Sequence, residues 1–408
     1  MYRPRTLTGA IERVSGAFPV LLLTGPRQVG KTTLLEHCGS RDRTYVSLDD
    51  LDQRDIAQSD PALFLQAHPP PATIDEVQYA PQLFSQLKLE VDRVRRPGMY
   101  WLTGSQKFHL MRGVSETLAG RVAILDLLGF SQAEVDGRAD RTAPFVPTAE
   151  WIAHARASRV EAGGLMDLYR RIWVGSFPGA VLASPEVRGD FYRSYVQTYV
   201  QRDVRDLARV GDEMAFTRLL RAAAARTGQL INYADLARDV GVDQKTVKTW
   251  LSILATSGLI YLLQPYHSNV TKRLVKTPKL YFLDTGLGAY LTRWSSPETL
   301  EAGAMSGAIL ETWMLAEILK SYWHHGQEAH LWFYRDRDQR EVDLLIERDG
   351  RLHPVEFKKT ASPGRSAAAH FAAIEKLELE RGPGAVVCLR KTELVLAEDV
   401  TAIPAGYL

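Results

Sequence analysis

Short apolar runs alternate with helix-length patterns over residues 1–135. The runs with strand character cover residues 20–23, 44–48, 72–74, 99–102 and 122–127. Such alternation is typical of an α/β domain in which helices cover a parallel sheet. We therefore expect residues 1–135 to form an α/β domain.

The rest of the chain divides by pattern into three further modules. Residues 136–215 lack strand alternation and predict a helical segment. Residues 216–290 show three helical patterns and then an apolar, strand-like run. Residues 291–408 return to mixed strands and helices, which predicts a second α/β domain. The predicted fold class is thus α/β, with helical modules between two α/β domains.

The overall charge is balanced. Across 408 residues, 50 Lys and Arg face 48 Asp and Glu, which gives a formal net charge of +2. Any basic surface therefore has to be local. The cysteines, Cys38 and Cys388, match no disulfide framework or zinc spacing, and no apolar run is long enough to cross a membrane. We expect a cytoplasmic protein without a membrane partner.

A glycine-rich loop follows the first strand and leads into a helix. Its sequence is GPRQVGKTT, and the residues predicted to bind ATP are Gly25, Pro26, Arg27, Gln28, Val29, Gly30, Lys31, Thr32 and Thr33. Glycines let backbone N–H groups wrap the phosphates, and the helix N-terminus adds its dipole. Lys31 is expected to reach the β- and γ-phosphates, and Thr32 to ligate Mg²⁺.

Two acidic residues end the third strand, in the sequence ATIDE. Hydrolysis at such a loop needs a carboxylate that holds the metal ion and, in many proteins, a second one that activates water. Asp75 is the predicted Mg²⁺ ligand and Glu76 the predicted general base. Two solvated acids at a strand end are the alternative, which the motif upstream disfavours.

Two further residues are candidates for the same site. Ser105 follows the fourth strand and would sense the γ-phosphate if that strand lies between the first and third strands. The alternative is that Thr103 and Ser105 cap the following turn. Arg121 precedes the fifth strand, where an arginine finger would stabilise transition-state charge in a neighbouring subunit of a homo-oligomer. An ordinary surface arginine is the alternative there.

Residues 216–290 have helix-turn-helix spacing. Helical patterns at 233–240 and from residue 244 flank a turn with Gly241, and a strand-like run follows, as in a winged helix. Between Thr217 and Lys279, ten basic residues outnumber three acidic ones. The predicted DNA contacts are Gln244, Lys245, Thr246, Lys248 and Thr249, at the exposed start of the second helix. Protein binding, or a merely solvated basic face, is the alternative.

The C-terminal α/β domain carries an acid-and-lysine pattern. Asp343 lies on one strand, and Glu356 and Lys358 lie on the returning strand, the D…(E)xK pattern of restriction-endonuclease-like domains. Glu356 and Lys358 share a strand face and can meet Asp343 across the hairpin. Asp343 and Glu356, with Glu311 of the preceding helix, are the predicted metal ligands, and Lys358 would activate water at this catalytic site. An exposed hairpin with alternating charges is the alternative.

The chain resembles the AAA+ branch of P-loop ATPases, and more closely a bacterial and archaeal group that joins an AAA ATPase to a C-terminal domain of unknown function. The matching stretches include GPRQVGKTT, ATIDEVQ, LTGSQ, LAGR, YVQRDVRDL, NYADLARDVGV, KRLVKTPKLYFLDTGLGAYL, GAILETWM and EVDLLIERDGRLHPVEFK. The resemblance spans nearly the whole chain. With the patterns above, it gives an AAA+ core (1–135), a helical lid or linker (136–215), a winged helix (216–290) and a restriction-endonuclease-like domain (291–408).

Together these observations predict a Mg²⁺-dependent AAA+ ATPase that associates with DNA through the winged helix and carries a nuclease-like C-terminal domain. ATP and Mg²⁺ are the expected cofactors, and DNA is the expected partner. The alternative is an ATP-driven switch that binds protein partners, in which the nuclease-like domain is an inactive scaffold.

Overall fold

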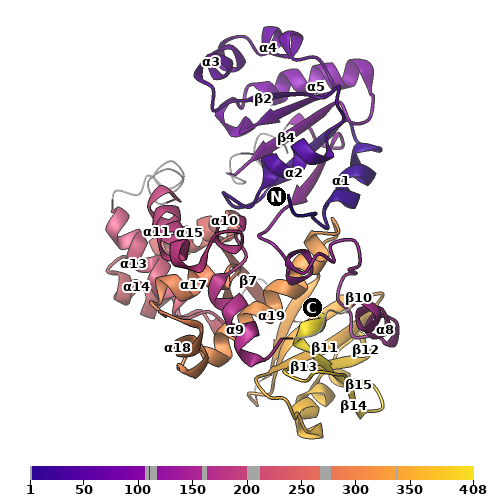
Figure 1. Ribbon diagram of the computed structural model, residues 1–408, viewed down its shortest axis with the longest axis vertical. Helices are drawn as coiled ribbons and strands as arrows, with labels where there is room; N and C mark the ends of the chain where they lie inside the picture. Colours follow the sequence, from indigo (N-terminus) through magenta and orange to yellow (C-terminus); the bar gives the residue numbers. More distant parts are fainter. Residues whose placement is uncertain are drawn as a thin grey trace. The chain divides into compact units, whose positions relative to one another are not determined.

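The structure is a computed structural model that describes residues 2–105, 110, 117–158, 163–199, 212–266, 277–336 and 338–408. The chain forms two compact units (Figure 1). Unit 1 comprises Met1–Phe130, Thr256–Gly258 and Trp323–Gln327, and unit 2 comprises Ser131–Ala255, Leu259–Tyr322 and Glu328–Leu408. Most of the motif YVQRDVRDL and the stretch KRLVK at 272–276 lie outside the described residues.

Unit 1 is built on a parallel five-stranded sheet. Its strands are β1 (Val20–Thr24), β2 (Thr44–Ser47), β3 (Ala72–Asp75), β4 (Tyr100–Gly104) and β5 (Val122–Asp126). The strand order is β2-β3-β4-β1-β5, and every pairing is parallel. The predicted parallel α/β fold is therefore confirmed. β4 pairs with both β1 and β3, which is the arrangement that the hypothesis for Ser105 requires.

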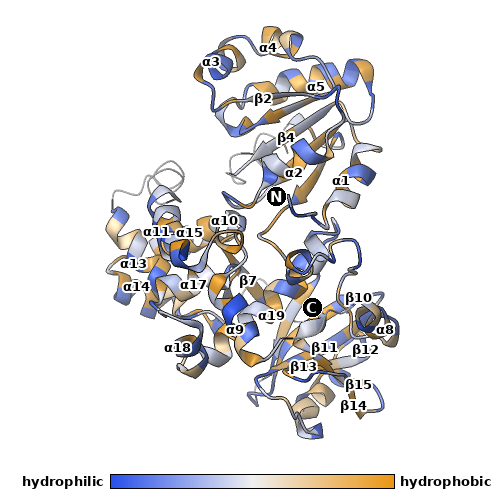
Figure 2. Cartoon of the chain, viewed as in Figure 1, coloured by the Kyte–Doolittle hydropathy of each residue, from blue (hydrophilic) through white to orange (hydrophobic). Residues whose placement is uncertain are grey.

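Helices connect these strands. They are α1 (Thr8–Ser15), α2 (Lys31–Cys38), α3 (Leu51–Ser59), α4 (Pro61–Ala67), α5 (Leu83–Val94) and the 3₁₀ turn η1 (Val77–Tyr79). Asp50 caps α3 and Asp60 caps α4, where Pro61 fills the first turn. Each such cap contributes about 1 kcal/mol. The exposed helix α3 is mostly hydrophilic (Figure 2), whereas residues such as Leu22 and Ile74 form the buried core.

Arg5 stabilises the glycine-rich loop from the N-terminal segment. Its side chain is 4% exposed. The guanidinium donates to the carbonyl oxygen of Val29 at 2.9 Å and to that of Leu128 at 2.7 Å. It also lies over the ring of Phe130, 4.7 Å from the ring centroid. One buried cation thus joins the end of the loop to the segment that follows β5.

The first elements of unit 2 along the chain are helices. Its helices are α7 (Gln132–Val135), α8 (Ala149–Ser158), α9 (Leu165–Val174), α10 (Pro178–Val181), α11 (Arg188–Tyr199), α13 (Glu213–Ala224), α14 (Tyr233–Val240), α15 (Gln244–Thr256), α17 (Thr285–Leu291), α18 (Pro297–Ala302) and α19 (Ser306–Trp323), with 3₁₀ turns η2 (Pro185–Val187), η4 (Arg365–Lys376) and η5 (Ala405–Tyr407). Asn232 caps the start of α14, and Gly241 ends it in the left-handed region (φ 78°). Residues 365–376 form the 3₁₀ segment η4, whose 12 residues are an uncommon length for 3₁₀ structure.

The strands of unit 2 form one mixed sheet. They are β6 (Gln229–Leu230), β7 (Ile260–Pro265), β8 (Lys279–Phe282), β9 (Leu331–Arg335), β10 (Glu341–Arg348), β11 (Arg351–Lys358), β12 (Glu380–Arg381), β13 (Gly384–Cys388), β14 (Leu394–Ala397) and β15 (Val400–Pro404). The order is β14-β15-β13-β11-β10-β9-β7-β8-β6, and β12 pairs with β11. Because β7 pairs with β8 on one side and with β9 on the other, a single sheet crosses the predicted module boundary at 290/291.

None of the helices in the described part of the chain is both long enough and apolar enough to span a bilayer. Helix α19 is 18 residues long, but its buried face also holds Glu317 and Lys320, which pair with each other at 2.8 Å. This paired charge is consistent with a helix inside a protein core.

Replacing Arg5 by Met tests the role of this cation. The variant leaves buried carbonyl oxygens without donors, so we expect the free energy of unfolding of unit 1 to fall by about 2–4 kcal/mol. Arg41→Met, at an exposed arginine, is the matched control and should change stability by less than about 0.5 kcal/mol. Denaturant unfolding measures both variants. Equal midpoints for Arg5→Met and wild type would show that the loop does not depend on Arg5.

Candidate functional site

The glycine-rich loop lies where the predicted phosphate-binding role requires, between the carboxyl end of β1 and the start of α2. Gly25 has φ 143°, and a Cβ there would come within 2.0 Å of the carbonyl oxygen of Leu127. Gly30, with φ 90°, is the N-cap of α2. Both backbone conformations favour glycine over any other residue. Within the loop, Gln28 is left-handed (φ 61°) and Val29 is fully buried.

Lys31 and Thr32 occupy the first turn of α2. The Lys31 ammonium donates to the carbonyl oxygens of Gly25 and Pro26, each at 2.9 Å, so the side chain curls back over the loop. Lys31 is 6% exposed. Thr33 is exposed on the next position of the same turn. The helix N-terminus, its dipole and this ammonium together make the loop electropositive.

Asp75 ends β3 and collects hydroxyl groups from three other elements. Thr32 donates to its carboxylate at 3.1 Å, and Tyr45 on β2 donates at 2.9 Å. Thr103 on β4 also donates to it. Burial, followed by the nearby Asp75 carboxylate, raises the pKa of Tyr45. The motif reasoning paired Asp75 with Thr32 but missed Tyr45, which belongs to no motif.

Glu76 follows directly and has an unusual backbone. Its φ is 56°, in the left-handed region, which costs of order 1–3 kcal/mol for a residue other than glycine. Its backbone N–H donates to the hydroxyl of Thr103 at 3.3 Å. The side chain accepts hydrogen bonds from Gln78 and, at 3.5 Å, from Ser105. The sheet therefore brings Ser105 beside Glu76.

Arg121 lies elsewhere in unit 1. It immediately precedes β5, whose first residue, Val122, pairs with Val20 at the beginning of β1. The glycine-rich loop follows the other end of β1, so Arg121 is at the opposite edge of the sheet. Its guanidinium forms a two-pronged ion pair with Asp92 of α5, at 2.6 and 3.0 Å. A role in a neighbouring subunit stays a prediction.

Helix α15 presents part of the predicted DNA surface. Gln244, Lys245, Lys248 and Thr249 are exposed. The Lys248 ammonium lies over the ring of Tyr233, 5.1 Å from its centroid. Thr246 is only partly exposed, and its hydroxyl donates to Asp243 at 2.7 Å. That bond is part of the helix start, so Thr246 is less available than its neighbours.

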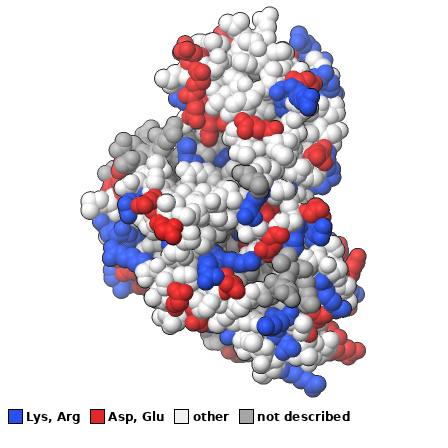
Figure 3. Space-filling view, in the orientation of Figure 1, with Lys and Arg blue, Asp and Glu red and all other residues white. Residues whose placement is uncertain are grey.

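The local basic excess is smaller at the surface than in the sequence. Arg226 pairs with Asp239, and Arg238 pairs with Asp235. Lys279 is 4% exposed and so contributes nothing to the surface. Lys272, Arg273 and Lys276 lie outside the described residues. Figure 3 shows Lys and Arg gathered over α13 and α14, with acidic side chains among them.

The residues predicted to form a nuclease-like site lie in one cluster of unit 2. The carboxylate of Asp343 on β10 accepts a hydrogen bond from the backbone N–H of Phe357 on β11 at 3.0 Å. Lys358 donates to Glu356 at 2.6 Å. Tyr281 on β8 donates to Glu311 on α19 at 2.7 Å. The fold thus gathers the four predicted side chains, and adds Tyr281 from the preceding module.

Burial changes the pKa values of the acidic and basic side chains in this cluster. Burial, and then repulsion from Asp343, raises the pKa of Glu356 to about 7. The same two causes raise the pKa of Glu311. Glu356 is 7% exposed, and its Oε2 has no hydrogen-bond partner within the described ranges. For Lys358, burial lowers the pKa, but the hydrogen bond to Glu356 and the nearby carboxylates outweigh burial and raise it.

Lys279 is the last of the ten basic residues counted toward the predicted DNA-binding region, but the structure places it in this buried cluster. It begins β8, where an otherwise apolar strand, KLYF, is fully buried. Its ammonium lies 2.5 Å from Glu341, 3.7 Å from Glu311 and 3.8 Å from Asp343. Burial lowers the pKa of Lys279, but these carboxylates outweigh burial and raise it. A lysine opening an apolar strand was the available sequence signal.

The two candidate metal sites differ in how well they fit a divalent ion. At the glycine-rich loop, Thr32 and Asp75 supply a hydroxyl and a carboxylate that already meet, the oxygen ligands that Mg²⁺ prefers. In unit 2, the Lys279 ammonium lies between two of the predicted ligands. Among the residues that the structure describes, no three Asp, Glu, His or Cys side chains are arranged to hold a metal ion. The predicted ligands Glu311, Asp343 and Glu356 thus lie close together, and two of them share their surroundings with the Lys279 ammonium.

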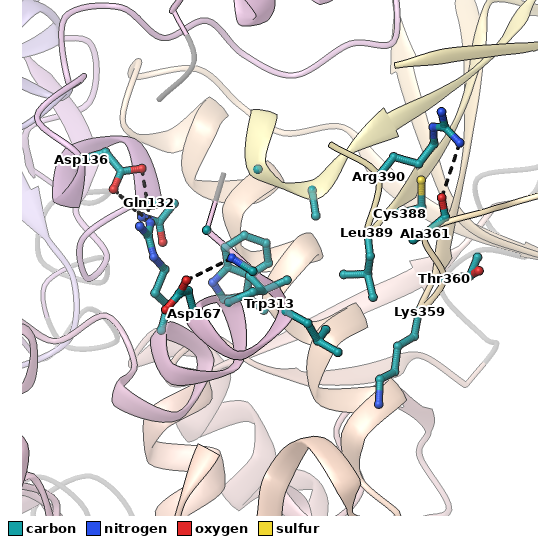
Figure 4. A pocket seen from close by; sticks show the side chains of 17 residues that line it. Gln132, Asp136, Asp167, Trp313, Lys359, Thr360, Ala361, Cys388, Leu389 and Arg390 are labelled. Atoms are coloured by element: carbon teal, nitrogen blue, oxygen red, sulfur yellow. Dashed lines mark hydrogen bonds and ion pairs between the residues drawn. The ribbon is translucent and has the colours of Figure 1, made fainter. Parts of the chain in front are cut away.

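A cavity of about 340 Å³ lies beyond the carboxyl ends of β11, β13 and β15. Figure 4 shows Asp136 and Asp167 on one side, Lys359, Thr360 and Arg390 on the other, and Trp313 between them. Carboxyl ends of parallel strands are a common place for ligands in α/β proteins. Charged side chains that line the cavity already have partners, because Arg171 pairs with Asp136 and Lys359 pairs with Glu301.

Family models match three stretches of the chain. Residues 17–136 match an AAA domain. Residues 165–298 match a domain of unknown function, DUF8612, and residues 306–408 match another, DUF4143. The first match agrees with the P-loop sheet of unit 1.

Curated proteins and solved structures also show similarity. The chain is 31% identical to the uncharacterized protein Rv2008c of Mycobacterium tuberculosis over 99% of its own length and 84% of the relative's. The uncharacterized protein Mb2031c of Mycobacterium bovis matches with the same identity and coverage. Among solved structures, the Walker-type ATPase PABY2304 of Pyrococcus abyssi is similar at 16% identity and a TM-score of 0.44, over 71% of this chain and 99% of that chain.

The raised pKa of Glu356 predicts a specific pH dependence of stability. The folded state holds the proton more tightly than the unfolded state, so this contribution is present at low pH and is lost as the pH rises through about 7. Between pH 5 and 8, we expect the stability of wild type relative to Glu356→Gln to fall by an amount on the order of 1–3 kcal/mol. Denaturant midpoints of unit 2 measure it.

Glu378→Gln, at an exposed glutamate of the same unit, is the control for this experiment. Its difference from wild type should stay constant over the same pH range. A constant difference for Glu356→Gln as well would show that Glu356 is ionised throughout.

Proposed function

This chain belongs to the same family as the two mycobacterial proteins, and on that premise we propose that it is a Mg²⁺-dependent ATP hydrolase that associates with DNA. The observation that carries the proposal is the arrangement around Asp75. One sheet edge combines a phosphate-binding loop, a carboxylate that meets Thr32, and a second carboxylate at Glu76. An AAA-type P-loop domain accounts for this arrangement.

Each residue of the loop has a physical role in this proposal. Backbone N–H groups between Gly25 and Thr33, apart from Pro26, which has none, would surround the phosphates, as at other helix N-termini. The Lys31 ammonium, which donates to loop carbonyl oxygens, would exchange these for the β- and γ-phosphate oxygens. Thr32 and Asp75 would hold Mg²⁺, which neutralises phosphate charge when bound.

Glu76 is the proposed general base. A base has to be held close to the attacking water in one orientation. The left-handed backbone of Glu76 and its contacts with Gln78 and Ser105 restrict the side chain in this way. From its position beside Glu76, the Ser105 hydroxyl would respond to the γ-phosphate.

DNA association rests on the module α13–α15 with β6, β7 and β8. Three helices and an antiparallel sheet in the order β6-β8-β7, with β6 between α13 and α14 along the chain, support the winged-helix hypothesis. Lys245 and Lys248 are exposed near the start of α15. Such side chains would contact phosphates, and Gln244 and Thr249 would reach base edges.

A switch that binds protein partners is the second candidate. It is favoured because Arg226 and Arg238 each form an ion pair with an aspartate of the same module, which leaves less free positive charge for DNA. In that case the nuclease-like region would be a scaffold. The two candidates share ATP hydrolysis and differ in whether DNA affinity depends on α15.

Glu76→Gln tests the proposed base. Because only the proton acceptor is lost, we expect ATP binding to persist while hydrolysis falls by about 10²–10⁴-fold. Binding of a fluorescent ATP analogue and phosphate release measure the two effects. Lys31→Ala should lose binding as well, and Glu12→Gln, at an exposed glutamate of α1, should change neither. Hydrolysis at the wild-type rate in Glu76→Gln would remove Glu76 as the base.

Lys245→Glu/Lys248→Glu tests the proposed DNA surface. Loss of two phosphate contacts should weaken binding to duplex DNA and flatten the slope of log affinity against log salt by about 2. Fluorescence anisotropy at several salt concentrations measures it. Lys376→Glu/Lys391→Glu makes the same charge change at exposed lysines away from α15. If both double variants lose affinity equally, the protein-binding switch becomes the better account.

A further inference from the structure

A buried ammonium lies inside the carboxylate cluster of unit 2. Lys279 Nζ is 2.5 Å from Glu341 Oε1, 3.7 Å from Glu311 Oε1 and 3.8 Å from Asp343 Oδ1. Its side chain is 5% exposed. An isolated ammonium would not remain charged at such a place, so these carboxylates have to compensate it.

One oxygen of each predicted metal ligand is already engaged in a hydrogen bond. Asp343 Oδ2 accepts from the backbone N–H of Phe357, and Glu356 Oε1 accepts from Lys358. Glu311 Oε1 accepts from Tyr281. Mg²⁺ binds oxygen ligands at about 2.0–2.1 Å in near-octahedral geometry. An ion that used the engaged oxygens would have to displace these contacts, whereas Glu356 Oε2 has no hydrogen-bond partner within the described ranges.

The charges of the cluster nearly balance without a metal ion. Its acidic members are Glu311, Glu341, Asp343 and Glu356, and its cations are Lys279, Lys358 and Arg335, which lies 3.5 Å from Glu341. A divalent cation added to this set would bring positive charge next to a buried ammonium. At the low effective dielectric of such a site, that repulsion would oppose metal binding.

We infer that Lys279 is the resident cation of this cluster, and that unit 2 therefore binds no divalent metal ion at its three predicted carboxylate ligands. The ammonium holds strand β8 to β10 and α19, and so joins the proposed winged helix to the nuclease-like strands. This inference does not depend on ATP hydrolysis, because it concerns residues of unit 2 alone. It assigns the Mg²⁺ requirement to the glycine-rich loop.

Mn²⁺ binding to the full chain tests the inference. All arms carry Thr32→Ala, which removes a metal ligand at the loop. Wild-type unit 2 should show no Mn²⁺ site that depends on Asp343. Lys279→Met keeps the side-chain length and removes the charge, so it should gain a Mn²⁺ site with a Kd on the order of 1 mM or tighter. Free Mn²⁺, counted by electron paramagnetic resonance, measures the binding.

Three comparisons decide the outcome. Lys279→Met/Asp343→Asn should lose the gained site, and Lys279→Arg, which keeps the charge, should not acquire it. Mn²⁺ should also raise the melting temperature of Lys279→Met but not that of the Lys279→Arg control. A site in wild type that Asp343→Asn removes would overturn the inference, and this arm decides even if Lys279→Met does not fold. A folded Lys279→Met that gains no site would overturn it as well.

Discussion

The position of β4 between β1 and β3 is the constraint on which the candidate nucleotide site depends. Parallel strands end at the same edge, so residues that are far apart in the sequence meet there. The hydroxyl of Thr103 on β4 reaches Asp75, and Ser105 reaches Glu76. If β1 and β3 were direct neighbours, neither contact would form. The strained backbone of Glu76 is held in place by the same strand, through its bond to Thr103.

Much of unit 1 could be predicted from the sequence because its signals are local. Strand runs, the loop and the strand-end acids each depend on adjacent residues, and the sheet confirms the predicted strands. Contacts that cross the sheet carry no local signal. Tyr45 reaches Asp75 because β2 and β3 are paired, and nothing in the sequence around Tyr45 indicates it. The ion pair of Arg121 with Asp92 is equally non-local.

In unit 2, the modules read from the sequence do not correspond to separate structural units. Residues 216–290 and 291–408 have different patterns, yet Gln264 and Pro265 of β7 pair with Trp332 and Phe333 of β9. The strands β6 and β12 have two residues each, too few for an alternating pattern to be recognised in the sequence. Shared pairing makes one structural unit from two sequence modules.

The two carboxylate sites of the chain differ in what surrounds the charge. Asp75 is contacted by hydroxyl groups, and no Lys or Arg of the described ranges forms an ion pair with it. Hydroxyl dipoles orient a carboxylate but leave its full negative charge, which a metal ion can then neutralise. Asp343 instead lies near the ammonium of Lys279. A buried ammonium compensates the carboxylate charge permanently. A divalent ion would have to displace this ammonium and also lose its own hydration shell. A carboxylate that is contacted only by neutral hydroxyl donors can therefore still bind a metal ion, whereas a carboxylate beside a buried ammonium already has its cation in the fold.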